Sequence, residues 1–291
     1  MRVRVLGTAA GGGLPQWNCG CESCCRAEEL GTQRTQDCLA ISGDGTTWYL
    51  VNASPDLRTQ LLAAPELRPP PGTRRTPVEG VLLTSAELDH TLGLVTLREA
   101  SQLTIYATEG VHRALREAFP ITEIIGNYTA VRSEQISNGL VLAGGIAVQV
   151  IGVGDKRPRY ASGLAGHDWV VAYRFTDTGS GRSLVYAPCL PAWHEAFERI
   201  IDGADTVLLD GTFHTEDELT RSSGSDRPAS SMGHLPIRAA LQEIARHPKS
   251  RFLFTHLNNT NPLVHPDAPE HAEVRAAGAA IAAERQLLVL E

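Results

Sequence analysis

Residues 81–93 have the sequence Val-Leu-Leu-Thr-Ser-Ala-Glu-Leu-Asp-His-Thr-Leu-Gly, in which a short apolar run leads to an acidic residue and a histidine. The run Val81–Leu83 is short and bounded by polar residues, which predicts a buried strand. Asp89 and His90 follow after a turn, and both residue types bind metal ions. The stretch therefore predicts a strand whose end presents metal ligands.

Two later apolar runs end in the same way. Val207–Leu209 leads directly to Asp210, and Phe252–Thr255 leads directly to His256. Alone, Asp210 could be a turn residue and His256 a structural histidine. In layered α/β proteins, however, side chains at strand ends converge on one crevice, and two carboxylates with two imidazoles suit Fe, Mn, Co or Zn. The sequence thus predicts one metal ion held by Asp89, His90, Asp210 and His256.

The rest of the chain alternates short strands with helices, which predicts one α/β domain over residues 1–291. The expected strands are Val3–Leu6, Trp48–Val51, Val81–Leu83, Leu103–Ala107, Val148–Ile151, Val170–Phe175, Leu184–Tyr186, Val207–Leu209, Phe252–Phe254 and Leu287–Leu290. The expected helices are Val111–Phe119, Pro191–Ile201, Leu235–His247 and Pro269–Glu284. We expect Pro65–Pro77 to be a surface loop and the polar stretch Thr220–Ser231 to be mobile.

Composition narrows the class of protein. The net charge of −7 argues against broad nucleic-acid binding, which requires a basic face. No apolar run approaches the roughly 18 residues of a membrane span, and the N-terminal residues lack the apolar segment of a signal peptide. We therefore expect a cytoplasmic protein that binds no membrane, and a homodimer is compatible with the sequence.

Four of the six cysteines lie within residues 19–25. Cys19, Cys21 and Cys24 could place three thiolates around one tetrahedral Zn²⁺, so we predict a structural zinc loop at about residues 17–26. The fourth ligand could be Cys25, Asn259 or His265. The alternative is a set of reduced buried cysteines, which would leave several reactive thiols without a role.

Two further histidines are candidates for function. His234 precedes the predicted helix Leu235–His247, whose positive N-terminal end would favour a neutral imidazole and could attract an anion. His214 follows Asp210 on the same loop. A surface or capping histidine is the alternative for each. The segment Gly7–Gly13 lacks the pattern of a phosphate-binding loop, and we interpret it as tight backbone near the floor of the active site.

The chain resembles one family in six motifs. This is the pyrroloquinoline quinone (PQQ) biosynthesis protein B family of the metallo-β-lactamase superfamily. The motifs, which extend over nearly the whole chain, are Val5–Cys21, Val51–Arg58, Leu88–Leu94 with Leu97–Glu99, Leu209–Phe213, Met232–Pro236 and Thr255–Pro262. The resemblance implies the metallo-β-lactamase fold, an αββα sandwich of four layers.

The superfamily carries His-x-His-x-Asp-His where this chain has Ser85-Ala-Glu87-Leu-Asp-His90, so the usual two-zinc site is half missing. The surviving ligands resemble a non-haem Fe(II) site. For this family, that implies O₂-dependent hydroxylation of the tyrosine ring in a Glu-Tyr-derived precursor of the quinone, with Asp210 bound to the iron. We expect Arg58 or Arg98 to pair with a substrate carboxylate, and His234 to act as the catalytic acid–base at the phenol.

The chain departs from the family at His214, where a tryptophan is usual, at Cys189, where a glycine is usual, and in its last residues. His214 could therefore contact the substrate or add a ligand, and a related aromatic substrate stays open. Two other classes also stay open: a metal-dependent hydrolase of phosphodiesterase or lactonase type, and a non-catalytic PQQ carrier.

Overall fold

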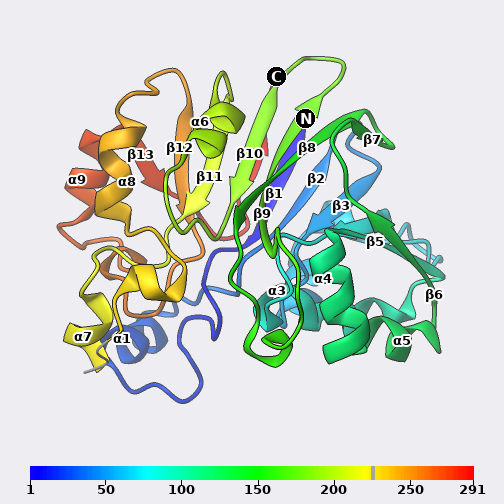
Figure 1. Cartoon of the computed structure of the whole chain (residues 1–291), viewed down its shortest axis with the longest axis horizontal. Helices are drawn as coiled ribbons and strands as arrows, with labels where there is room; N and C mark the ends of the chain where they lie inside the picture. The colour runs from blue at the N-terminus through cyan, green and yellow to red at the C-terminus, as the bar shows by residue number, and fades with distance from the viewer. Residues whose placement is uncertain (224–226) are drawn as a thin grey trace.

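The computed structural model describes residues 1–223 and 227–291. Two seven-stranded sheets form its centre (Figure 1). The first has the order β14-β1-β2-β3-β4-β5-β6 and the second β13-β12-β11-β10-β9-β8-β7. The first sheet comprises β1 (Arg2–Gly7), β2 (Cys38–Ser42), β3 (Trp48–Val51), β4 (Val78–Leu82), β5 (Gln102–Ala107), β6 (Ala130–Gln135) and β14 (Leu287–Val289). The second comprises β7 (Leu140–Leu142), β8 (Ile146–Gly154), β9 (Val170–Asp177), β10 (Ser183–Ala187), β11 (Thr206–Asp210), β12 (Arg251–Thr255) and β13 (Ala279–Ile281).

Helices cover the outer face of each sheet (Figure 1). The α-helices are α1 (Glu22–Leu30), α2 (Leu57–Ala63), α3 (Leu88–Thr91), α4 (Glu109–Arg113), α5 (Ile121–Gly126), α6 (Glu195–Ile201), α7 (Glu218–Ser223), α8 (Ile237–Ile244) and α9 (His271–Ala276). The 3₁₀ helices are η1 (Pro65–Leu67), η2 (Leu92–Glu99), η4 (Arg159–Ala161), η5 (Ala229–Met232) and η6 (Pro262–Val264), and η3 (Ala114–Ala118) is a π-helix.

Three separate hydrophobic cores hold the layers together. In β11, Val207 packs toward helices α6 and α8, whereas the next residue, Leu208, packs between the two sheets. In β4, Val81 and Leu82 alternate in the same way. Successive side chains of a strand point to opposite faces, so an uninterrupted apolar strand is buried on both. The result is the αββα sandwich that the resemblance implied, and the predicted fold is confirmed.

The parallel strands bring the site together. In the first sheet β3, β4, β5 and β6 are parallel neighbours, and in the second β10, β11, β12 and β13 are. The carboxyl ends of parallel strands open at the same edge of a sheet. Asp89 and His90 follow β4, Asp210 ends β11 and His256 follows β12, so the four candidate ligands lie near these carboxyl ends.

The end of the chain differs from its prediction. The predicted helix Pro269–Glu284 stops at Ala276, and Ala279–Ile281 instead forms β13 beside β12. Gly278 has φ +81°, a left-handed conformation that ends a helix and suits glycine. The small residues of this segment fit either structure, so pairing with β12 decides between them.

Two other predictions were incomplete. Helix α8 begins only at Ile237, after Pro236, and α6 begins at Glu195. Strands β2, β6 and β7 were not predicted. Of the stretch Thr220–Ser231, which we expected to be mobile, residues 224–226 lie outside the described residues, and the flanking parts include the end of α7 and most of η5. No helix in the described ranges is long and apolar enough to cross a membrane.

Candidate metal centre

The predicted ligands lie where strands end. Asp89 and His90 lie in α3, after the turn that follows β4, Asp210 is the last residue of β11, and His256 directly follows β12. His256 has φ +59°, a conformation that costs a non-glycine residue free energy and is concentrated at functional turns. These turns direct side chains from separate strands toward one crevice.

Asp89, His90 and His256 form the first part of the centre. Asp89 Oδ2 lies 3.3 Å from His256 Nε2 and 4.0 Å from His90 Nε2. His90 Nδ1 lies 2.7 Å from Ser85 Oγ, whereas its buried Nε2 has no hydrogen-bond partner in the part of the chain that the structure describes. A buried unpaired nitrogen is costly, and a metal ion would satisfy it. The residues present therefore fit a bound cation.

Asp210 lies on the other side of His256. Its Oδ2 accepts a hydrogen bond from the Leu190 amide at 2.7 Å and lies 2.8 Å from His234 Nδ1. The ligand atoms of Asp210, His234 and His256 all lie within 4.8 Å of one another, and so do those of His90, Cys189 and His256. The four predicted ligands are thus neighbours, but they divide into two groups that share His256. Each group includes a residue outside the predicted set, His234 in one and Cys189 in the other.

The Thr212 hydroxyl links the second group. Its Oγ1 lies 2.7 Å from Asp210 Oδ1, 3.0 Å from His234 Nδ1 and 2.8 Å from His256 Nδ1. Contacts of this kind orient metal ligands and set their tautomers. Thr212 was not predicted from the sequence, although it stands two positions after a predicted ligand.

The electrostatics of the cluster are uneven. Burial lowers the pKa of His90 to about 4, so this imidazole is neutral and ready to bind a cation. Burial also opposes protonation of His256, but its hydrogen bond to Asp89 and the charges of Asp89, Asp37 and Asp210 outweigh burial and raise its pKa to about 9. Burial would raise the pKa of Asp89, yet His90 and His256 hold it below its usual range. In the metal-free protein, His256 is therefore protonated, and its positive charge balances the neighbouring carboxylates.

A cavity of about 520 Å³ opens onto these side chains. Its lining includes Asp89, His90, Cys189, His234 and His256. It also includes Gly11, where an added Cβ would lie 3.3 Å from Asp89 Oδ2, so Gly7–Gly13 does approach the site as predicted. The cationic residues of the lining are Lys156, Arg157, Arg159 and Arg227. The cavity is therefore suited to a small anionic molecule.

The three residues predicted to bind substrate lie elsewhere. Arg58 and Arg98 are not part of this cavity lining, and Arg98 instead contacts the Val95 carbonyl and Glu99. His214 is buried, and its Nε2 pairs with Glu273. These predictions relied on motif position, which does not reveal where a side chain points. Of the cationic residues that do reach the cavity, Lys156, Arg157 and Arg159 follow β8, in a segment that carried no recognisable motif.

His234 also differs from its prediction in detail. It precedes α8 by three positions, and its Nδ1 faces Asp210 and Thr212. The carboxylate contact, not the end of a helix, positions this imidazole. His234 lines the cavity, as a catalytic residue must.

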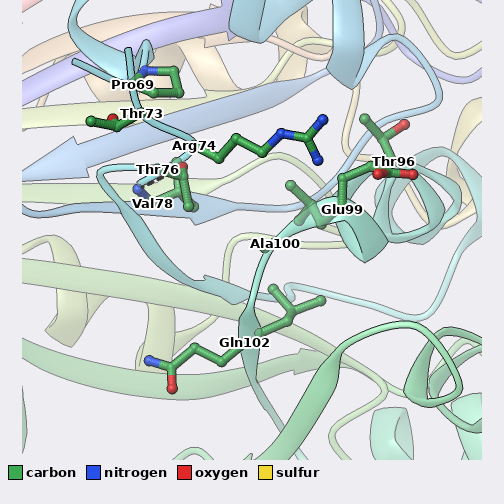
Figure 2. A pocket seen from close by; sticks show the side chains of 11 residues that line it. Pro69, Thr73, Arg74, Thr76, Val78, Thr96, Glu99, Ala100 and Gln102 are labelled. Carbon is green, nitrogen blue, oxygen red and sulfur yellow. Dashed lines mark hydrogen bonds between the residues drawn. The ribbon is translucent and has the colours of Figure 1, made fainter. Parts of the chain in front are cut away.

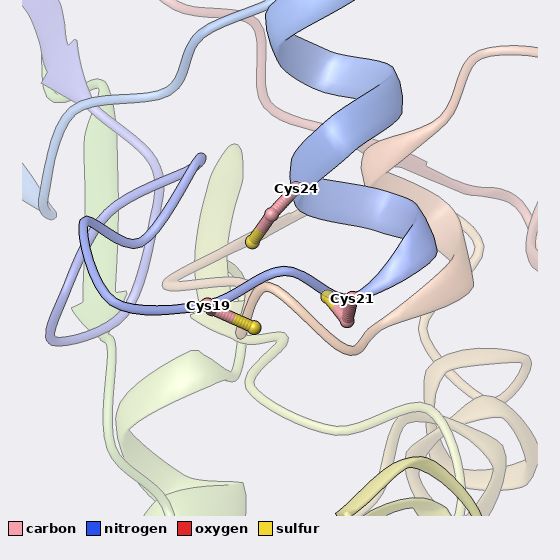
Figure 3. Close-up of side chains that lie close together, drawn as sticks. All are labelled: Cys19, Cys21 and Cys24. Atoms are coloured by element: carbon pink, nitrogen blue, oxygen red, sulfur yellow. The ribbon is translucent and has the colours of Figure 1, made fainter.

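The predicted zinc residues converge (Figure 3). The sulfurs of Cys19, Cys21 and Cys24 all lie within 4.8 Å of one another, with Cys24 on helix α1 and the other two in the loop before it. Of the candidate fourth ligands, the Asn259 amide lies 3.3 to 3.6 Å from all three sulfurs, whereas the exposed Cys25 contacts the Gly20 carbonyl. The donor set fits Zn²⁺, and zinc binding here remains a prediction.

A second cavity, of about 420 Å³, lies between the loop after η1 and the segment that joins η2 to β5 (Figure 2). Its wall is mostly threonine and apolar side chains with Arg74 and Glu99, and it holds no histidine or cysteine. It offers no donor set for a metal, so the chemistry belongs to the first cavity.

Comparisons with known proteins show which proteins the chain resembles over its length. Residues 47–257 match the model of the β-lactamase superfamily domain. The chain is 38% identical over 296 aligned residues to coenzyme PQQ synthesis protein B of Cupriavidus necator, with 96% of each chain covered. It is also 38% identical over 309 residues to the protein of that name from Bradyrhizobium diazoefficiens, with both chains covered completely.

Solved structures extend the comparison. The crystal structure of Zn²⁺-bound PqqB from Methylobacterium extorquens superposes with a TM-score of 0.89 at 33% identity, covering 100% of both chains. A diphosphatase of the PhnP family superposes with a TM-score of 0.70 at 19% identity over 100% of this chain and 98% of that one, which shows the shared fold alone.

Proposed function

The chain belongs to the coenzyme PQQ synthesis protein B family, and on this basis we propose that it is a non-haem Fe(II) enzyme of PQQ biosynthesis. The proposed reaction is the O₂-dependent hydroxylation of the tyrosine ring in a Glu-Tyr-derived precursor. One observation carries the proposal: two imidazoles and a carboxylate converge at a cavity, with His90 Nε2 buried and unpaired among the described residues. Two histidines with a carboxylate and open positions are the donor set of many non-haem iron oxygenases.

The positions of Ser85 and Glu87 support a single ion over two. In the wider superfamily, histidines at these positions serve a second metal. Here the Ser85 hydroxyl holds His90 Nδ1, which leaves Nε2 with its lone pair directed away from that contact. Glu87 lines the cavity, and burial together with the charge of Asp89 raises its pKa. Ser85 orients the ligand His90 and Glu87 lines the cavity, roles that fit a site for one metal ion better than a site for two.

Fe(II) bound in this centre would supply the binding and activation of O₂. The protein supplies the position of the substrate. The side chains of Phe213, Tyr160 and Met232 give the cavity apolar wall for an aromatic ring. Lys156 and Arg159, both exposed at the same cavity, can pair with the carboxylates of a Glu-Tyr-derived molecule.

His234 is the candidate for proton transfer. Its Nδ1 is held by Asp210 at 2.8 Å and Thr212 at 3.0 Å, so Nε2 is the atom left to exchange a proton with the phenol. A nearby carboxylate stabilises the imidazolium that forms, as Asp210 can do here. In this proposal Asp210 positions His234 as well as serving the metal.

The test is anaerobic reconstitution of the metal-free protein, followed by oxygen-consumption measurement with Glu-Tyr dipeptide. We expect oxygen uptake with Fe(II) and none with Zn²⁺. His234→Ala should slow turnover by roughly 10²–10⁴-fold while the iron content stays at the wild-type level. Loss of iron from His234→Ala would instead make this residue a ligand.

Two results would contradict the proposal. Zn²⁺- or Mn²⁺-dependent cleavage of a generic phosphodiester without oxygen would identify a hydrolase. A tight one-to-one complex with the quinone, without any metal-dependent turnover, would identify a carrier.

A further inference from the structure

Cys189 lies among the candidate ligands. Its sulfur and the ligand atoms of His90 and His256 all lie within 4.8 Å of one another. It stands two residues after β10, whose parallel neighbour β11 ends in Asp210. The carboxyl end of β10 therefore opens at the same sheet edge as the ends of β11 and β12, and Cys189 lines the cavity.

The surroundings of Cys189 are those of a ligand. Its thiol has no hydrogen-bond partner in residues 1–223 and 227–291, as holds for the neighbouring buried His90 Nε2. Burial and the negative charges of Asp210 and Asp89 raise the pKa of the thiol, so without a cation it stays protonated. A cation between these groups would satisfy all of them together.

Cys38 shows what a purely structural cysteine looks like in this protein. It is fully buried in β2, and its thiol donates to the Asn52 carbonyl at 3.2 Å. It belongs to no group of metal-ligand side chains among the described residues. Cys189, which is only partly buried, differs from Cys38 in lying close to two histidines of the candidate metal centre.

We propose that Cys189 is a further ligand of the active-site metal, beside the predicted ligands Asp89, His90, Asp210 and His256. On binding, the S–H bond breaks, a sulfur–metal bond forms and the proton leaves to solvent, so the thiol binds as a thiolate. A nitrogen, oxygen and sulfur donor set is softer than one of nitrogen and oxygen alone, which favours Zn²⁺ and Fe(II) over Mn²⁺. This inference rests on the metal centre of the proposed function, but not on its iron or its oxygen chemistry.

Cobalt spectroscopy tests the inference. Co²⁺ bound to thiolate absorbs strongly in the near ultraviolet through sulfur-to-metal charge transfer, whereas Co²⁺ bound to nitrogen and oxygen alone does not. Metal-free wild type, Cys189→Ser and Cys38→Ser are loaded with Co²⁺ to equal occupancy, which elemental analysis verifies. We expect Cys189→Ser to lose part of this absorption and Cys38→Ser to keep all of it. The remainder belongs to Cys19, Cys21 and Cys24, and it should disappear from the double variant Cys24→Ala/Cys189→Ser.

Affinity is the second measurement. Removal of a ligand should weaken binding of the active-site ion by roughly tenfold or more. Even the loss of a residue that only hydrogen-bonds to a ligand typically lowers metal affinity by about 10–100-fold. Should Cys189→Ser fail to fold, judged by circular dichroism, X-ray absorption at the iron edge of the Fe(II)-loaded wild type replaces it. A scatterer at about 2.3 Å supports the thiolate, and nitrogen and oxygen alone overturn it.

The outcomes separate the two proposals. Two bound Co²⁺ per chain with identical spectra for wild type and Cys189→Ser would overturn the role of Cys189 and leave the metal centre intact. One bound Co²⁺ per chain that Cys24→Ala abolishes would remove the active-site metal itself, and the proposed function with it.

Discussion

Metal binding should release a proton from His256, and this release should set the pH dependence of metal affinity. In the metal-free protein, His256 Nε2 lies 3.3 Å from Asp89 Oδ2, and the pKa of His256 is raised from 6.5 to about 9. A metal ion at Nε2 must displace that proton. At pH 7, about two pH units below this pKa, only roughly 1% of His256 is neutral, which weakens binding about 100-fold, or about 2.7 kcal/mol.

The proton of His256 therefore contributes a rise in affinity of about tenfold per pH unit from pH 6.5 toward 9, where its contribution levels off. His90, with its pKa of about 4, is already neutral in this range and releases no proton. If Cys189 binds as a thiolate it adds a second proton, so Cys189→Ala isolates the contribution of His256. We expect about one proton released per ion in that variant at pH 7.

The assay combines two measurements. Competition with a chromophoric chelator gives affinities at pH 6.5, 7.5 and 8.5. Calorimetric titration in buffers of different ionisation enthalpy counts the protons. His167→Ala, which removes a histidine whose side chain is 85% exposed, is the control and should behave as wild type. A flat affinity profile with no proton release from Cys189→Ala would refute the pairing of His256 with Asp89.

The pairing of His256 with Asp89 should also make the stability of the metal-free protein depend on pH. Because folding raises the pKa of His256, the contribution of this residue to stability should be complete below pH 6.5 and lost as the pH rises through about 9. Chemical denaturation at several pH values measures this change. Thr212→Val should weaken metal binding by roughly 10–100-fold because it removes the hydroxyl that contacts Asp210, His234 and His256, whereas Thr212→Ser should retain wild-type affinity in the chelator assay. Cys24→Ala should lower the zinc content by one ion per chain and the melting temperature by roughly 5 °C, about 2 kcal/mol, while the exposed Cys25→Ser leaves both unchanged. Gly93→Ala should destabilise the protein by about 1–3 kcal/mol in urea unfolding, because the added Cβ would lie 2.2 Å from the Ser54 carbonyl oxygen. Unchanged stability would contradict this close approach of the two backbone segments.

Much of the fold was predictable because its strands are short, apolar and buried on both faces. Val207–Leu209 and Phe252–Phe254 were predicted as strands, and both lie within observed strands. Prediction failed where local preference is weak. Ala279–Ile281 pairs with β12 although its small residues resemble a helix, because the position of Gly278 and the open edge of the sheet outweigh an intrinsic preference of a few tenths of a kcal/mol.

The sequence alone determined which side chains stand at the ends of strands. Asp89, His90, Asp210 and His256 could be recognised because a metal-binding residue that follows an apolar run, directly or after one turn, emerges at the edge of the sheet. Only the tertiary structure decided how these residues group. The parallel register of β10, β11 and β12 brings Cys189 near His256, and Asp210 faces His234. The packing of the two sheets adds His90, which follows β4 of the first sheet.

The same holds for the cavity. Lys156 and Arg159 follow β8 in a loop, and no pattern in their neighbours distinguishes them from Arg58 or Arg98. Where a long side chain points depends on the packing of elements distant in sequence, which becomes defined only when the two sheets and their connecting turns come together.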